Sequence, residues 1–129
     1  MSQYVRDLSE AALDDELLQS KEPILVDFWA PWCGPCRAMS PAVEAAAQKL
    51  AGEAKVYKVN VDDNPSVSPR FSIRGIPTLI LFRDGRETNR LVGLSSKEQI
   101  EALLLHDLAL GQKSLSRNSG ARRKGPRSG

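Results

Sequence analysis

One Cys-x-x-Cys segment constrains this chain most, because it holds the only two cysteines among the 129 residues. Trp32-Cys33-Gly34-Pro35-Cys36 directly follows an apolar run at residues 24–30 and opens a helical pattern that extends to about Leu50. Two thiols three positions apart at the start of a helix lie on one face, close enough to form a disulfide. The pattern therefore predicts a strand and a helix with a dithiol at their junction.

The two thiols are expected to differ in reactivity. Unpaired backbone N–H groups and the positive end of the helix dipole stabilise a thiolate at a helix N-terminus. Cys33 is therefore predicted to be the nucleophile, and Cys36, one turn further in, to be the shielded resolving thiol. Gly34 and Pro35 place no charge between them, which favours a reductant over an oxidant.

Other uses of a cysteine pair fit this sequence poorly. Zinc and iron–sulfur sites need about four ligands, and His106 is the only histidine. Attachment of c-type haem requires a histidine directly after the second cysteine, where this chain has Arg37. A structural disulfide across so short a loop would stabilise the fold only weakly. We therefore expect redox chemistry and no bound metal.

Charge divides the chain near Gly111. Residues 1–111 hold 12 basic and all 16 acidic residues, a net charge of −4, whereas residues 112–129 hold 6 basic and no acidic residues. We expect one domain over residues 1–111 and a basic, Gly/Ser-rich, disordered tail over residues 112–129, because the tail has too few apolar residues to offset its ordering entropy. The tail could be inert or could bind nucleic acid weakly through its basic residues.

Neither export nor membrane insertion is expected. The first residues lack a basic segment followed by an apolar one, and no apolar stretch approaches the length of a membrane span. We expect a cytoplasmic monomer, because a reducing compartment keeps an exposed dithiol available for turnover.

Alternating helices and strands are predicted within residues 1–111. In chain order we first expect a helix capped by Ser9 that runs to about Leu18, a strand at 24–30, and the helix that extends from the cysteine motif to about Leu50. A strand at 56–61 and a short helix at 65–71, capped by Asn64, should follow. The last elements are a strand at 78–83, a turn at Asp84-Gly85, a strand at about 87–92, and a helix from Ser95 or Ser96 to Gly111.

Two motifs in this arrangement resemble the thioredoxin family. They are Val26-Asp27-Phe28-Trp29-Ala30-Pro31-Trp32-Cys33-Gly34-Pro35-Cys36 and Gly75-Ile76-Pro77-Thr78, and the resemblance covers about residues 4–110. It implies an α/β thioredoxin fold with a central mixed five-stranded sheet flanked by four helices. It also implies a protein-disulfide reductase that exchanges thiols with client disulfides and carries no bound cofactor. A separate NADPH-linked thioredoxin reductase would return the electrons, since no Gly-rich dinucleotide motif follows any strand here.

Asp27 is the first candidate site residue outside the cysteine motif. Its apolar neighbours leave little room for a solvated face, so we expect a buried carboxyl group. The resemblance implies that Asp27 lies behind Cys36 and accepts its proton, and that Lys58 on the next strand tunes this carboxylate. Lys58 also alternates with Val59 as a solvent-facing strand residue would.

Pro77 is the second candidate. The resemblance implies a cis peptide bond before Pro77, opposite the cysteines, which leaves the Ile76 backbone free to pair with an extended client. It also implies an apolar client groove formed by Trp32, Val61, Gly75, Ile76, Val92 and Gly93. Leu94 is bulkier than the small residue that the family would place beside this groove. Trp29 and Trp32 could instead be packing residues, and His106 is expected on a helix surface.

One other class of function remains open. Thioredoxin-like chains can also serve as rigid assembly subunits in which the dithiol is incidental. Insulin reduction separates the two classes.

Overall fold

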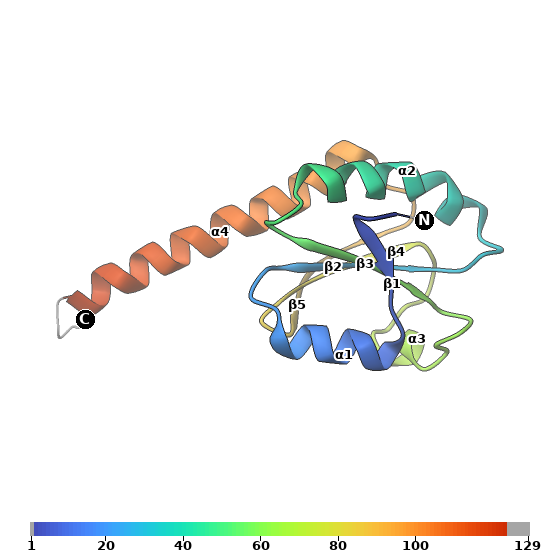
Figure 1. Cartoon of the computed structure of the whole chain (residues 1–129), viewed down its shortest axis with the longest axis horizontal. Coiled ribbons are helices and arrows are strands. Elements are labelled where there is room, and N and C mark those ends of the chain that lie inside the picture. The colour runs from blue at the N-terminus through green and yellow to red at the C-terminus, as the bar shows by residue number, and fades with distance from the viewer. Residues whose placement is uncertain (1, 124–129) are drawn as a thin grey trace.

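Five strands form one mixed sheet in the order β1-β3-β2-β4-β5 (Figure 1). The computed structural model describes the backbone of residues 2–123 and the side chains of residues 2–111. β1, β3 and β2 are parallel, and β4 and β5 are added antiparallel at the other edge. The strands are β1 (Val5–Asp7), β2 (Ile24–Trp29), β3 (Lys55–Asn60), β4 (Thr78–Arg83) and β5 (Arg86–Val92).

Four helices cover the two faces of this sheet. They are α1 (Glu10–Gln19), α2 (Gly34–Lys49), α3 (Val67–Arg70) and α4 (Lys97–Arg123). Figure 1 shows α2 and α4 on one face and α1 and α3 on the other. The predicted α/β architecture, with a central five-stranded mixed sheet flanked by four helices, is confirmed. No helix in the described part of the chain is both long and apolar enough to cross a membrane.

The nearly continuous apolar run of β2 is explained by burial on both faces. Leu25 packs under α2 and α4 with Met39 and Ile100, whereas Val26 faces the opposite core with Leu13. Successive side chains of a strand point to opposite faces, so β2 contributes to both cores. Each fully buried large apolar side chain contributes about 1.5–3 kcal/mol, which fixes the strand that leads into the cysteine motif.

Three local predictions are confirmed by hydrogen bonds and backbone angles. Ser9 caps α1 by accepting a hydrogen bond from the Ala12 N–H at 3.1 Å. Ser96 and Gln99 form a reciprocal capping box at the start of α4, with distances of 2.8 and 3.1 Å. The β4–β5 hairpin turns at Asp84-Gly85, where φ is +54° and +80°.

Two elements differ from the sequence-based expectation. β1 was not predicted from the residue pattern, since three residues are too few to show a period of two. The short helix α3 begins at Val67, with Ser66 at the N-cap position but without a side-chain capping hydrogen bond, so the predicted start at Asn64-Pro65 is wrong. The Asn64 side chain instead accepts a hydrogen bond from the Glu10 N–H at 2.9 Å, which satisfies a free donor in the first turn of α1.

The last helix also differs, because α4 continues to Arg123 and the predicted end at Gly111 is wrong. Composition predicted disorder from residue 112, yet the backbone of residues 112–123 is helical, and Figure 1 shows this end of α4 standing away from the sheet. Gly111 lies close to the Arg83 side chain, and a Cβ at this position would be 2.8 Å from the guanidinium group. No proline lies within α4, and its two internal glycines, Gly111 and Gly120, cost only about 1 kcal/mol each. Residues 1 and 124–129 lie outside the described residues.

Candidate functional site

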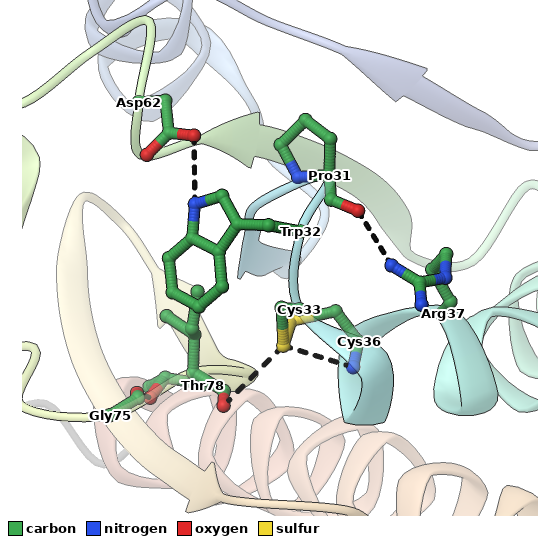
Figure 2. The surroundings of a disulfide bond; sticks show 9 residues. Pro31, Trp32, Cys33, Cys36, Arg37, Asp62, Gly75 and Thr78 are labelled. Atoms are coloured by element: carbon green, nitrogen blue, oxygen red, sulfur yellow. Dashed lines mark hydrogen bonds between the residues drawn. A yellow bond between two sulfur atoms is a disulfide. The ribbon is translucent and has the colours of Figure 1, made fainter.

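The two cysteines form a disulfide at the N-terminus of α2 (Figure 2). Cys33 is the N-cap residue, and its Sγ accepts a hydrogen bond from the Cys36 N–H at 3.1 Å. Their Cα atoms are 5.2 Å apart, and Gly34 and Pro35 form the first two exposed positions of the helix between them. The motif therefore lies where backbone donors and the helix dipole stabilise negative charge on sulfur.

The surroundings of the two sulfurs differ although both cysteines are only 4% exposed in this oxidised form. Cys33 Sγ lies 3.7 Å from the carbonyl oxygen of Ile76, on the loop before β4. Cys36 instead borders a cavity of about 270 Å³ beneath α2. The other residues that line this cavity are Asp27, Trp29, Arg37, Ser40 and Lys58.

Asp27 is buried in the middle of β2, as its apolar neighbours predicted. Its side chain is 2% exposed, and Oδ1 has no hydrogen-bond partner in the described part of the chain. Burial raises the pKa of Asp27 from 3.8 to about 7, while the charge of Lys58 lowers it and that of Asp7 raises it. This carboxyl group can therefore take up or release a proton near neutral pH.

Lys58 lies beside Asp27, because the two residues are register partners in the β2–β3 pair. The half-buried side chain lines the Asp27–Cys36 cavity, so it is not the simple solvent-facing residue that its alternation with Val59 could also indicate. Its Nζ lies 4.2 Å from the centre of the Trp29 ring, within cation–π range. Trp29 Nε1 is buried without a hydrogen-bond partner among the described residues.

The loop before β4 lies against the dithiol. The Ile76–Pro77 peptide bond is cis, as the resemblance implied. The Pro77 carbonyl accepts a hydrogen bond from the Gly93 N–H at 2.8 Å, and the Thr78 hydroxyl donates to the Gly75 carbonyl at 2.5 Å. Within the described residues nothing pairs with the Ile76 N–H. The loop is therefore held in place while one backbone donor stays available beside Cys33.

An apolar surface surrounds this loop. Trp32 is 67% exposed, and its Nε1 donates a hydrogen bond to Asp62 at 2.9 Å, which orients the indole ring (Figure 2). Val92 and Leu94, which flank Gly93 in the sequence, are 66% and 64% exposed, and the φ of Gly93 is +88°. Half-buried Val61 and Ile76 pack against the cysteines.

The structure packs Val61 and Ile76 against the cysteines and joins Gly93 to Pro77 by a hydrogen bond. The sequence analysis missed one residue whose charge acts on Asp27. Asp7, on the unpredicted strand β1, lies opposite Lys58 in the β1–β3 register. Only that register, which no local pattern encodes, could have identified it.

His106 is exposed on α4 as expected. No cluster of three metal-ligating side chains occurs in the described part of the chain.

Comparison with known proteins matches this chain to one family. The Thioredoxin family profile matches residues 4–106. Thioredoxin 1 of Synechococcus elongatus is 49% identical over 90 residues, which cover 70% of this chain and 84% of the relative. Thioredoxin of Pseudomonas aeruginosa is 40% identical over 104 residues, which cover 81% and 96%. Thioredoxin of Alicyclobacillus acidocaldarius is 51% identical over 89 residues, which cover 69% and 85%.

Proposed function

The chain belongs to the thioredoxin family and is a protein-disulfide oxidoreductase, and we propose that Cys33 attacks client disulfides while Cys36 resolves the mixed disulfide. The Cys33 thiolate displaces one client sulfur as a thiolate and forms a mixed disulfide. Cys36 then loses its proton and attacks Cys33 Sγ, which releases the second client thiolate. The client gains two electrons, the protein is left with the Cys33–Cys36 disulfide, and a thioredoxin reductase restores the dithiol with electrons from NADPH.

The position of Cys33 as the N-cap of α2 carries this assignment. Its sulfur accepts the Cys36 N–H hydrogen bond at 3.1 Å, and that bond stabilises a Cys33 thiolate more than a thiol. Sulfur at this point also experiences the positive end of the helix dipole. Cys36 Sγ accepts no equivalent hydrogen bond in the described residues, and Cys36 borders the cavity that contains Asp27.

Asp27 is the proposed base for the resolving step. It lines the same cavity as Cys36, and its raised pKa matches the pH at which a thiol proton must be accepted. When Cys36 attacks Cys33, its proton moves into this cavity and onto the Asp27 carboxylate. Lys58 stabilises the ionised form of Asp27 across the β2–β3 pair.

The surface around Cys33 is the proposed client site. The free Ile76 N–H can pair with an extended client segment in the manner of an added strand. Pro77 holds Ile76 against Cys33, and the apolar surface covers client side chains next to the disulfide. The proposed client-binding residues are Trp32, Val61, Gly75, Ile76, Val92 and Gly93.

We further propose a cytoplasmic monomer whose tail over residues 112–129 is dispensable for disulfide reduction. A reducing compartment keeps the dithiol available for turnover. The tail holds six basic residues and no cysteine, so its one proposed activity is weak, salt-sensitive contact with nucleic acid.

Single cysteine variants test which thiol attacks. Cys36→Ser should retain the nucleophile but not the resolving thiol, so it should accumulate mixed disulfides with insulin on non-reducing gels. The matched Cys33→Ser protein should form few adducts and should not reduce insulin. Adducts that form preferentially with Cys33→Ser would reverse the assignment.

A further inference from the structure

Three charged residues lie in one row across the parallel half of the sheet. The β1–β3 register pairs Asp7 with Lys58, and the β2–β3 register pairs Lys58 with Asp27. Register partners on adjacent parallel strands share a face, and this is the face covered by α2. A single ammonium group on the middle strand therefore has a carboxylate neighbour on each side.

The two ends of the row differ in their access to solvent. Asp27 is buried beside Cys36, whereas Asp7 is exposed at the edge strand. Asp7 and Lys58 line a cavity of about 730 Å³ between β1 and α2, together with Ser2, Val5, Arg6, Ser40 and Glu44. Lys58 and Ser40 also line the cavity that contains Asp27 and Cys36. Lys58 thus borders both spaces and can respond to charge in either.

Lys58 forms an ion pair with neither Asp7 nor Asp27. Among the described residues Lys58 forms no ion pair within 4.0 Å, and its Nζ instead lies 4.2 Å from the centre of the Trp29 ring. Other charges that face this region are Arg37 on α2 beside Asp27, and Arg6 on β1 and Glu44 on α2 around the larger cavity. After burial, the charges that act on the Asp27 pKa are those of Lys58, which lowers it, and Asp7, which raises it.

We propose that Asp7 is a positioning residue for the exchange reaction, which through the shared ammonium group of Lys58 sets how strongly Asp27 holds its proton. This inference rests on the proposed role of Asp27 as the base for Cys36. The carboxylate of Asp7 attracts the Lys58 ammonium and so weakens its stabilisation of ionised Asp27. It also repels the Asp27 carboxylate weakly. Both effects keep Asp27 a stronger base than it would be with Lys58 alone.

The size of the effect follows from the geometry of the sheet. Asp7 and Asp27 are two strand spacings apart, or about 10 Å. A unit charge at that distance, partly screened by water, should shift the titration of Asp27 by about 0.3 to 1 pH unit. Asp7→Asn removes the charge with little change in shape, so the Asp27 titration midpoint should move down by this amount.

NMR titration of the Asp27 carboxyl carbon in the oxidised protein measures this shift directly. Asp15→Asn is the matched control, because it removes an exposed carboxylate from α1 on the other face of the sheet. We expect a lower midpoint in Asp7→Asn and an unchanged one in Asp15→Asn. In a Lys58→Met background the effect of Asp7→Asn should be smaller, since the shared ammonium is gone.

A pH profile of the resolving step separates this inference from the base role on which it rests. With both correct, the acid limb of the profile should move down with the NMR midpoint in Asp7→Asn. An Asp27 midpoint identical in Asp7→Asn and Asp15→Asn would overturn the role of Asp7. A shifted midpoint with an unshifted rate profile would instead contradict Asp27 as the base and leave its electrostatic link to Asp7 intact.

Discussion

Replacing Asp27 with alanine should change how the stability of the oxidised protein depends on pH. The folded protein holds the Asp27 carboxyl group at a pKa of about 7, whereas the unfolded chain holds it near 3.8. The native state therefore binds more protons than the unfolded state between these two values. Asp27 therefore costs the fold little stability below about pH 4, destabilises it progressively as pH rises from about 4 to 7, and has its full effect above pH 7.

The magnitude follows from the same two values. They differ by about 3 pH units, and each unit corresponds to 1.36 kcal/mol, so the full penalty is about 4 kcal/mol. Asp27→Ala removes this penalty and also loses some packing next to the cavity beneath α2. The packing loss does not depend on pH, so the pH-dependent part of the difference isolates the buried charge.

Urea unfolding of both oxidised proteins at intervals from pH 4 to pH 8 tests this reasoning. The stability of Asp27→Ala relative to the wild type should increase by about 4 kcal/mol across that range, most steeply between pH 5 and 7. Asp15→Ala, which removes an exposed carboxylate from α1, serves as the control and should show little change. Parallel curves for the wild type and Asp27→Ala would refute a buried carboxyl group with a raised pKa.

Two further outcomes follow from the surface around the site and from the tail. Leu94→Ala should raise KM for insulin by about fivefold with little change in kcat, because a largely exposed leucine beside the groove would lose about 1 kcal/mol of client contact; an unchanged KM would remove Leu94 from the client surface. Deletion of residues 112–129 should leave the unfolding midpoint and insulin turnover unchanged and should abolish any low-salt binding of nucleic acid; a loss of turnover would mean that the tail packs on the catalytic domain.

Local signals in the sequence predicted most of the fold. Ser9, the Asp84-Gly85 turn and the Ser96–Gln99 pair each fix one boundary by interactions within a few residues. β1 was missed because its place depends on pairing with β3, which follows about 50 residues later. Gly111 misled the prediction because this glycine lies inside α4, close to the Arg83 guanidinium, rather than at the end of the helix.

The site shows the same division between local and long-range information. The apolar neighbours of Asp27 predicted its burial, and the helix that begins after Cys33 predicted the asymmetry of the dithiol. No residue pattern could place Asp7 beside Lys58, since a shift of one residue in the β1–β3 register would turn Asp7 to the opposite face. The cis bond before Pro77 followed only from the family resemblance, because most X-Pro bonds are trans.

Reductase-coupled reduction of insulin tests the central claim most directly. The assay follows NADPH oxidation by a purified thioredoxin reductase with insulin as the client, and compares the full chain with its Cys33→Ser variant at equal concentration. The full chain should turn over many times, whereas Cys33→Ser should not exceed the reaction without added protein. Equal rates for the two proteins would contradict a reductase that works through Cys33.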